Sequence, residues 1–460
     1  MRLLFVMFCL PLVGTAAGQQ ATSPNVILMM ADDLGWSDVG FNGGKTIKTP
    51  QLDAMTKHGM VFERFYAAAP VCSPTRGSML TGRHPYRLGI PYANTGFLKP
   101  QELTLAEMLK AKGYRTGHFG KWHLGTMTRT EKDANRGDPK NARFYSPPQD
   151  NGFDVCLSTE SKVPTWDPGL IPQDQNGLKS WNAMKNPLTE GKPFGTSFWD
   201  ETGTKVTDNL LGCASRVIVD RAEPFIRQSV AANKPFFAVV WFHAPHLPVV
   251  AGPKYFAMYS DAQTDYHRNY YGCVTALDEQ VGRIRKVLRE LNVADNTLIA
   301  FCSDNGPEGK GPGPGVAKPF IGRKRSVREG GVRVPGVIEW PAMIKAGSRT
   351  KLAAVTSDFV PTLAELVGVE LTVKPVDGMS LVPVFEGKLR ERAKPIGFVS
   401  RGGAAWHEGK YKIYRGGKKP WTLHDLDADP SESKDLSAEM PDRVKQMVAR
   451  YEKWYAALRN

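Results

Sequence analysis

Long uninterrupted apolar segments are scarce in this chain of 460 residues. Beyond residues 3–13, no segment approaches the roughly 18 apolar residues that a membrane-spanning helix needs, so the sequence predicts no membrane span. The chain also lacks an internal repeat and any zinc-finger, RNP or basic-zipper pattern, and its Lys and Arg residues are scattered rather than arranged in stripes. These absences argue against a membrane protein, a repeat protein and a nucleic-acid-binding protein.

The first residues have the pattern of an export signal. Arg2 supplies a positive start, residues 3–13 an apolar core, and residues 14–18 a small-residue cleavage region. We therefore predict a signal peptide at residues 1–18 and an exported protein, periplasmic or secreted. A buried first helix or a membrane anchor is the alternative reading, but the apolar run is too short to span a bilayer.

Cysteine is also sparse. Removal of residues 1–18 takes Cys9 with it and leaves five cysteines, an odd number that in an exported protein indicates one special thiol. If Cys72 is chemically consumed, four remain, enough for two disulfides. Four free, buried thiols are the alternative, and the sequence does not choose between the two. These four are Cys156, Cys213, Cys273 and Cys302.

What is present is an ordinary globular composition with an excess of positive charge. Hydrophobic residues make up 41% and charged residues 23%, and the length suffices for a large α/β domain with a smaller one beside it. The net charge of +14 raises the local concentration of anionic molecules near the surface. Sulfated molecules and nucleic acids both meet that description, so the charge alone does not select the partner.

Three apolar runs are predicted to be buried strands, and each ends at polar side chains. Continuous apolar runs without alternation suit strands of a parallel sheet that is covered on both faces. Ligands of such sheets bind beyond the carboxyl ends of the strands, so one crevice could collect all three polar groups. Residues 25–30 precede Asp32 and Asp33, residues 236–242 precede His243 and His246, and residues 297–302 precede Asp304 and Asn305.

Helices are predicted between these runs, at residues 104–112 and 274–291, from their apolar periodicity. Residues 126–203 are rich in Gly, Pro, Asn, Asp and Lys, which indicates long surface excursions, and residues 306–319 indicate another loop. We divide the mature chain into a catalytic domain at 23–370 and a C-terminal α+β subdomain at 371–460. In the latter we expect strands at 411–414 and 421–426 and a helix at 441–458.

The segment after Val71 reads Cys72-Ser-Pro-Thr-Arg76-Gly-Ser-Met-Leu-Thr-Gly82-Arg. Proline suits the first turn of a helix and Gly82 suits its end, so Cys72 is predicted at a helix N-terminus with Arg76 one turn later. The positive end of the helix dipole and the guanidinium would favour a thiolate there. A buried structural cysteine is an equally good interpretation on physical grounds alone.

This Cys-x-Pro-x-Arg block, with the Thr-Gly-Arg that follows it, resembles the signature of the type I sulfatases, the arylsulfatase-like branch of the alkaline phosphatase superfamily. The resemblance covers nearly all of the mature chain. It implies an α/β fold with a large, mixed, mainly parallel sheet sandwiched by helices, followed by the smaller C-terminal subdomain. It also implies that a maturation enzyme oxidises Cys72 to formylglycine and that the protein hydrolyses sulfate esters.

The resemblance further implies a metal site. Asp32-Asp33 matches the first metal-binding pair of the family and Asp304-Asn305 the second, with the residue at position 72 close to the ion. The two pairs offer four oxygen-donor side chains and no imidazole or thiolate. Such a donor set favours a hard cation, so we predict calcium, with magnesium less favoured. Either pair alone would be read as a strand-end turn or a helix cap.

The remaining expected site residues come from three further blocks of the resemblance. Lys121 and His123 lie in Gly-Lys-Trp-His, where the lysine would bind sulfate and the histidine would move a proton of the formylglycine hydrate. His246, in Pro-His-Leu-Pro, would bind sulfate near the leaving oxygen, and His243 could line the pocket or be structural. Lys324 matches the second sulfate-binding lysine, although arginines flank it on both sides.

The implied mechanism is nucleophilic attack on sulfur by the hydrated formylglycine, with Arg76 holding that side chain. We expect a sulfated small molecule or glycan as substrate; the preference for a carbohydrate depends on export, basic charge and long loops. Two alternatives remain open. One is a phosphonate or phosphate monoester hydrolase of the same superfamily, and the other is a non-catalytic binder of sulfated glycans in which Cys72 stays a thiol.

Overall fold

The computed structural model describes residues 23–174, 181–309, 313–372 and 375–458. The predicted signal peptide at 1–18, including Cys9, lies outside these ranges. Within them, no helix has the length and apolar character needed to cross a bilayer. All five of the described cysteines are free and buried, which agrees with the free-thiol alternative.

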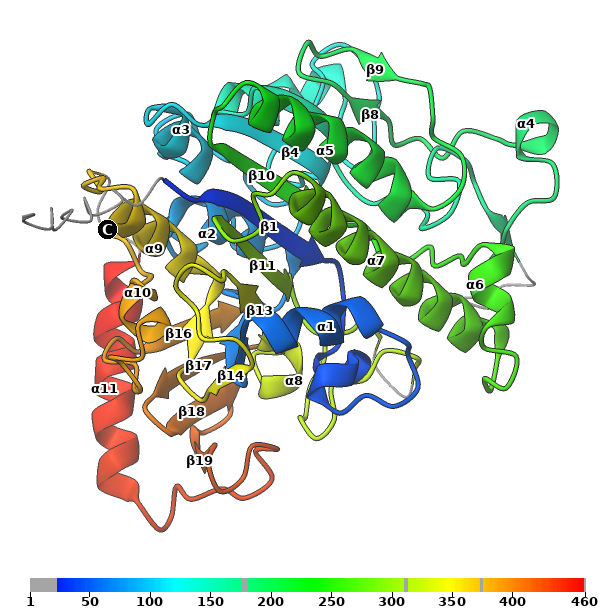
Figure 1. The fold of residues 1–460 in the computed structure, drawn as a ribbon. Coiled ribbons are helices and arrows are strands. Elements are labelled where there is room, and N and C mark those ends of the chain that lie inside the picture. Colours follow the sequence, from blue (N-terminus) through cyan, green and yellow to red (C-terminus); the bar gives the residue numbers. More distant parts are fainter. Residues whose placement is uncertain (1–22, 175–180, 310–312, 373–374, 459–460) are drawn as a thin grey trace, which may run out of the picture.

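A ten-stranded mixed sheet forms the centre of the molecule (Figure 1). Its middle strands pair in parallel, and antiparallel strands extend the sheet at both sides. From edge to edge the strands are β14 (Ser348–Thr350), β2 (Met60–Phe62), β13 (Gly336–Glu339), β11 (Thr297–Ser303), β1 (Asn25–Ala31), β10 (Phe236–Trp241), β4 (Arg115–Lys121), β5 (Val155–Thr159), β8 (Phe198–Trp199) and β9 (Lys205–Val206).

The three predicted buried strands are confirmed as β1, β10 and β11, and they are neighbours in the sheet. Every residue of these strands is buried, as their continuous apolar sequences require of strands covered on both faces. Their parallel pairing runs to the ends, where Ala31 lies opposite Ser303. The polar residues that follow β1 and β11 therefore leave the sheet side by side.

Helices cover both faces of the sheet, which confirms the predicted α/β class (Figure 1). Apolar side chains of one group of helices share a core with one face, and those of a second group share a core with the other. The first group is α2 (Cys72–Thr81), α3 (Leu105–Lys110), α9 (Phe359–Leu366) and α10 (Val382–Phe385); the second is α1 (Pro50–His58), α5 (Ala214–Ala231) and α7 (Asp265–Glu290).

Helix α7 begins at Asp265 rather than at residue 274, because the Thr264 side chain caps it by accepting a hydrogen bond from the His267 backbone amide. Region 126–203, expected to be surface excursions, also contributes β5 and β8 to the main sheet, and β9 follows directly after it. Short elements complete this part of the fold. They are α4 (Pro187–Glu190), α6 (Pro253–Ala257), α8 (Glu329–Val332), the pair β6 (Gln173–Asp174) and β7 (Trp181–Asn182), and a small sheet of β12 (Arg333–Val334), β3 (Phe65–Tyr66) and β15 (Ala354–Val355).

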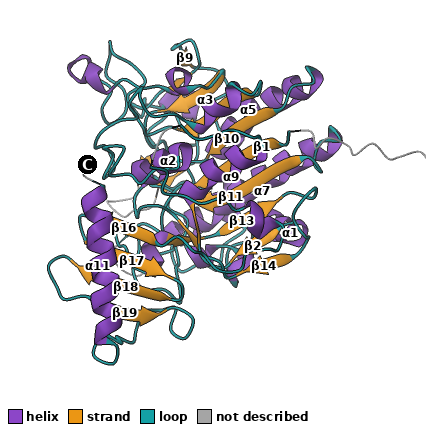
Figure 2. Ribbon diagram, turned by 90° about the vertical axis from the view of Figure 1, so that its left-hand side faces the viewer, coloured by secondary structure: helices purple, strands orange, loops and turns teal. Residues whose placement is uncertain are grey.

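The C-terminal part forms a separate four-stranded antiparallel sheet with a helix packed against it (Figure 2). The two predicted strands and the predicted helix are present, with slightly different bounds, and two strands that precede them were not predicted. The elements are β16 (Ile396–Ser400), β17 (Gly403–Glu408), β18 (Tyr411–Gly416), β19 (Thr422–Asp425) and α11 (Pro441–Ala457).

Helix α2 ends as predicted at Gly82, which has a φ of 70° and caps the helix through its backbone amide. A Cβ atom added there would lie 2.9 Å from Cβ of Val360. We expect Gly82→Ala to lower the free energy of unfolding by about 2 kcal/mol, because it combines the left-handed backbone penalty with overpacking.

Chemical denaturation measures this loss. Gly409→Ala is the matched control, since Gly409 has a φ of 61° but open space around its Cβ position. The control should lose only the backbone contribution of about 1 kcal/mol. Equal losses in the two variants would contradict the packing argument at Gly82.

Candidate active site

The carboxyl ends of β1 and β11 bring four predicted metal ligands together. Asp32 and Asp33 follow β1, Asp304 and Asn305 follow β11, and all four are fully buried. The Asp33 backbone amide donates to Asp304 Oδ1 at 3.2 Å. The Asn305 side-chain amide donates to Asp33 Oδ1 at 2.7 Å. Parallel strand pairing thus joins two sequence motifs that lie about 270 residues apart.

Helix α2 carries Cys72 and Arg76 to the same place. Cys72 is the first residue of the helix and is 2% exposed. The guanidinium of Arg76 donates to Asp304 Oδ2 at 2.7 Å and to the Lys121 carbonyl at 2.9 Å, and it lies 3.6 Å from Asp32 Oδ2. Arg76 therefore connects the helix to the ends of three strands, β1, β4 and β11.

The surroundings of Cys72 oppose the thiolate that the helix terminus and Arg76 would favour, which agrees with the alternative of a buried thiol. Burial raises the pKa of this thiol to about 11, and the nearby Lys121 and Lys324 lower it only in part. Desolvation of a sulfur anion outweighs the nearby positive charges. As an unmodified cysteine, Cys72 is therefore a neutral thiol at physiological pH.

Two lysines reach the carboxylates. Lys121 ends β4, and its Nζ lies 2.5 Å from Asp32 Oδ2. Lys324 Nζ lies 2.7 Å from Asp33 Oδ1 and 3.3 Å from Glu308 Oε2. Both side chains are buried.

Lys324 is flanked by Arg323 and Arg325, and the sequence could have been aligned one position off. The contacts of these two arginines differ from those of Lys324. Arg323 donates to the backbone carbonyls of Glu308 and Gly315. Arg325 pairs with the Glu308 carboxylate. Of the three consecutive cations, Lys324 is the one that contacts a predicted metal ligand.

The two histidines after β10 differ in their surroundings. His246 Nε2 lies 3.6 Å from Asp33 Oδ2, and its Nδ1 donates to the Leu247 carbonyl at 2.6 Å. Burial and the charge of Lys324 lower the pKa of His246 to about 4. His243 is fully buried and its Nε2 lies 3.3 Å from Thr159 Oγ1.

His123 follows β4 and is 4% exposed, with a φ of 59°. Burial, followed by the charges of Lys121 and Arg136, holds the pKa of its imidazole well below the usual range. Its Nε2 lies 2.8 Å from Oδ1 of Asn94. His123 is therefore a neutral imidazole within the electrostatic reach of the lysine at the end of β4.

The arrangement fits a hard divalent cation. Asp32 Oδ1 and Asn305 Oδ1 are buried and have no hydrogen-bond partner among the described residues. Burial and the neighbouring charge of Asp32 raise the pKa of Asp304 to about 7, so positive charge is still favourable there. Potential ligand atoms of Asp32, Asp33, Cys72 and His246 lie within 4.8 Å of one another. Unpaired carboxylate and amide oxygens are the donors that calcium and magnesium prefer.

Several residues near this cluster carry no signal that sequence reasoning could use. Asn94 and Lys162 are single polar residues in loops. Burial, followed by the charges of Lys121 and Lys324, lowers the pKa of Lys162. Two serines near the end of β5 have different hydrogen-bond partners. Ser158 Oγ lies 2.7 Å from His118 Nδ1, and Ser161 Oγ accepts a hydrogen bond from the Asn135 side-chain amide at 2.7 Å.

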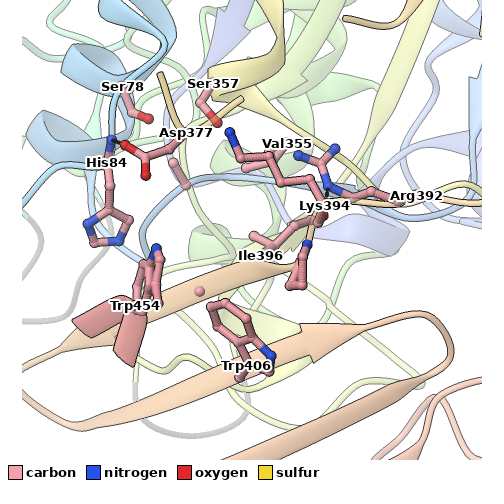
Figure 3. A pocket seen from close by; sticks show the side chains of 13 residues that line it. Ser78, His84, Val355, Ser357, Asp377, Arg392, Lys394, Ile396, Trp406 and Trp454 are labelled. Carbon is pink, nitrogen blue, oxygen red and sulfur yellow. Dashed lines mark hydrogen bonds between the residues drawn. The ribbon is translucent and has the colours of Figure 1, made fainter. Parts of the chain in front are cut away.

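A hollow of about 230 Å³ lies away from this cluster, between α2 and the C-terminal sheet (Figure 3). Two tryptophans, Trp406 and Trp454, form one wall. Its charged groups are engaged within the protein: Arg392 pairs with Asp358, and the Lys394 ammonium donates to backbone carbonyls. This cavity is a joint between the two parts of the chain, whereas the strand-end cluster collects acids, cations and unpaired oxygens.

Comparison with known proteins agrees with this geometry. Residues 24–369 match the family model for sulfatases. N-acetylgalactosamine-6-sulfatase of Sus scrofa is 33% identical over 429 residues, covering 88% of this chain and 74% of that protein. Steryl-sulfatase of Rattus norvegicus is 30% identical over 437 residues, covering 81% and 72%.

Among solved structures, Ps i-CgsB in complex with k-i-k-neocarrahexaose superposes with a TM-score of 0.79 at 29% identity, covering 94% of this chain and 93% of that chain. The phosphonate monoester hydrolase of Agrobacterium radiobacter shares the fold at a TM-score of 0.64 and 20% identity. The chain belongs to the sulfatase family. It is a sulfuric ester hydrolase, which confirms the predicted family, fold and enzyme class.

Proposed function

We propose that this sulfatase is an exported enzyme that removes sulfate from a carbohydrate, using Cys72 matured to formylglycine and a bound calcium ion. The observation that carries the site assignment is the convergence of Asp32, Asp33, Asp304 and Asn305 on the first turn of α2. The carbohydrate assignment is supported by relatives named N-acetylgalactosamine-6-sulfatase and by the structural neighbour bound to k-i-k-neocarrahexaose. Export is supported by the N-terminal sequence pattern.

In this proposal the four oxygen-donor side chains would hold the ion. A bound ion would supply Lewis-acid chemistry that polarises a sulfate oxygen. Magnesium would meet the same donors and is the less favoured alternative, because six or more oxygen ligands at flexible distances suit calcium. Arg76 holds Asp304 and Asp32 in position and keeps its charge throughout, since guanidinium does not deprotonate.

The matured residue 72, as its hydrate, would supply a hydroxyl whose oxygen attacks sulfur while the S–O bond to the alcohol breaks, and the proton of that hydroxyl would pass to the departing alcohol oxygen. The remaining hydroxyl would then lose its proton, the C–O bond to sulfate would break, and the aldehyde would re-form; addition of water would restore the hydrate. The residues of the chain support both steps. Lys121 and Lys324, which lie against Asp32 and Asp33, would stabilise charge on the sulfuryl oxygens, and His246 would bind sulfate near the leaving oxygen. His123, a neutral imidazole, would accept the proton of the remaining hydroxyl and then release it to solvent water.

The test is an assay of the purified, matured protein with calcium against sulfated oligosaccharides, an aryl sulfate and the matching aryl phosphate. Sulfate release from the oligosaccharides supports the proposal. Faster hydrolysis of the aryl phosphate would favour the phosphonate or phosphate hydrolase reading. Binding of glycans without release of any anion, by a protein whose Cys72 is shown by mass spectrometry to stay a thiol when it is produced together with the maturation enzyme, would favour the non-catalytic binder.

Calcium should stabilise the folded protein. The buried oxygens of Asp32 and Asn305 and the raised pKa of Asp304 all favour a cation that the unfolded chain cannot hold. At a concentration about 100 times the dissociation constant, binding should add about 2.7 kcal/mol to the free energy of unfolding. A thermal melt of the chelator-treated protein, repeated with added calcium and with added magnesium, measures this.

Asp304→Asn is the matched variant for the calcium melt, because it keeps the shape of the side chain and removes its charge. It should lose most of the calcium-dependent shift. An equal shift in both proteins would contradict the assignment of this carboxylate as a ligand, and a larger shift with magnesium would reverse the choice of ion.

A further inference from the structure

The imidazole of His123 takes part in a polar network that reaches the protein surface. Asn94 Oδ1 is 2.8 Å from His123 Nε2. The Asn135 side-chain amide lies 3.2 Å from the same Asn94 oxygen and donates to Ser161 Oγ at 2.7 Å. Asn94 and Asn135 are exposed, whereas His123 is buried beneath them.

Buried contacts hold the two loops of this network in place. The backbone amide of Asn135 donates to Glu160 Oε2 at 3.0 Å, and Arg136 pairs with Glu160 Oε1 at 2.8 Å. Arg136 also donates to the Gly96 carbonyl at 2.6 Å, which ties the Asn94 loop to the Asn135 loop. The carboxylate of Glu160 is fully buried. The position of the Asn94 amide is therefore fixed by the fold.

The backbone supports the same geometry. Both Asn94 and His123 have a φ of 59°, in the left-handed region that asparagine and histidine enter more readily than most residues. In this backbone conformation the two side chains meet, with His123 Nε2 2.8 Å from Asn94 Oδ1. A neutral imidazole carries one N–H, and the partner of one ring nitrogen decides which nitrogen holds it.

We propose that Asn94 is a positioning residue that selects the Nε2–H tautomer of His123. Asn94 Oδ1, which already accepts from Asn135, accepts this N–H as well. The other ring nitrogen, Nδ1, is buried and has no hydrogen-bond partner among the described residues, so its lone pair is available to accept a proton. The role of the accepted proton in catalysis depends on the proposed function; the tautomer itself does not.

The tautomer can be measured without activity. In ¹⁵N-labelled protein, long-range proton–nitrogen correlation should show a protonated Nε2 and an unprotonated Nδ1 for His123, with the signals assigned by their loss in His123→Gln. Asn94→Gly removes the acceptor and keeps the backbone conformation, and should abolish this preference. An Nδ1–H tautomer in the unaltered protein, or an unchanged spectrum in Asn94→Gly, would overturn the proposal.

Kinetics provide the second readout. Asn94→Gly should lower kcat by about 100-fold with KM changed by less than about threefold, because proton transfer by a positioned base contributes at least that much. Asn94→Asp keeps an acceptor oxygen and should restore most of the rate. Asn292→Gly is the matched control, since Asn292 has a φ of 56° in an exposed turn after α7.

The outcomes separate this proposal from the proposed function. A raised KM with an unchanged kcat would make Asn94 a substrate-binding residue and overturn its positioning role. If the unaltered protein, with formylglycine at position 72 verified by mass spectrometry, releases no sulfate from any tested substrate, the proposed function fails, and the nitrogen spectra alone decide the tautomer. If Asn94→Gly does not fold, Asn94→Ser, which shortens the side chain beyond the reach of the imidazole, replaces it in both measurements.

Discussion

Cys72→Ala should abolish sulfate release, with a loss of about 10⁴-fold or more in kcat, because removal of a covalent nucleophile leaves only binding and electrostatic stabilisation. The substitution removes the one side chain at the N-terminus of α2 that lies among the carboxylates and lysines. It should leave the fold intact, since alanine suits a helix and the lost volume is a single buried sulfur. The measurement is sulfate release with the sulfated oligosaccharide that the unaltered protein hydrolyses best.

Cys213→Ala is the matched control, because Cys213 is also free and buried but precedes α5 on the other face of the sheet. It should keep nearly full activity. Retention of more than about one hundredth of the rate in Cys72→Ala would contradict the nucleophile assignment. If the unaltered protein is inactive and mass spectrometry shows that residue 72 is still cysteine, the sample has not been matured. Its inactivity is then explained by the raised pKa of the Cys72 thiol, because a neutral thiol is a poor nucleophile.

Lys412→Met should lower the free energy of unfolding by about 3–5 kcal/mol, because it removes the cation paired with buried Glu432 and leaves buried Glu329 with Arg333 alone. Lys412, on β18, reaches Glu329 Oε1 at 2.8 Å and Glu432 Oε1 at 3.1 Å, and all three side chains are fully buried. The pKa of Lys412 is raised by its two carboxylate partners despite burial. Its stabilising contribution is therefore complete at neutral pH and is lost only when the pH rises through that raised pKa.

Lys410→Met is the matched control two residues away. Its ammonium pairs with Asp425 at the surface, so we expect a change within about 0.5 kcal/mol. A double variant, Lys412→Met with Glu432→Gln, should recover part of the loss because one buried negative charge is removed. Denaturant titration at pH 7 measures all three variants. Equal stability of the Lys412 and Lys410 variants would contradict the electrostatic account.

The Lys412 network also explains how the C-terminal sheet relates to the site. Glu329 begins α8, and it accepts a hydrogen bond from the Tyr66 hydroxyl at 2.8 Å as well as the ion pair from β18. Lys324 lies five residues before Glu329 in the same segment. The buried charge network therefore joins the small C-terminal sheet to the segment that supplies a cation to the site.

Much of the site could be predicted because its ligands stand directly after apolar strands. The two acidic pairs lie side by side because β1 and β11 are parallel neighbours whose carboxyl ends meet at one edge of the sheet. Asp32 and Asp33 follow β1, and Asp304 and Asn305 follow β11. The choice of Lys324 over its arginine neighbours was carried by the resemblance and agrees with the contacts. The catalytic roles of all these residues remain predictions.

Other features could not be predicted, for identifiable reasons. The choice between a thiolate and a buried structural thiol at Cys72 stayed open in the sequence because burial of the helix start depends on how α2 packs; in the structure, burial raises the pKa of this thiol. Asn94 gives no sequence signal because one asparagine in a loop is ordinary. Strands β16 and β17 were missed because Gly and Ala interrupt the alternation that the later strands show.

By itself, the sequence determined the central strands, the helix that begins at Cys72, the sulfatase family and the positions of the acidic pairs. These features depend on local periodicity, on turn and capping residues, and on a short sequence motif, none of which requires knowledge of the tertiary structure. Only the tertiary structure decided which cation reaches which carboxylate, which nitrogen of His123 is engaged, and that Cys72 is a neutral thiol. Those properties depend on distances between segments far apart in the chain and on the water that packing excludes.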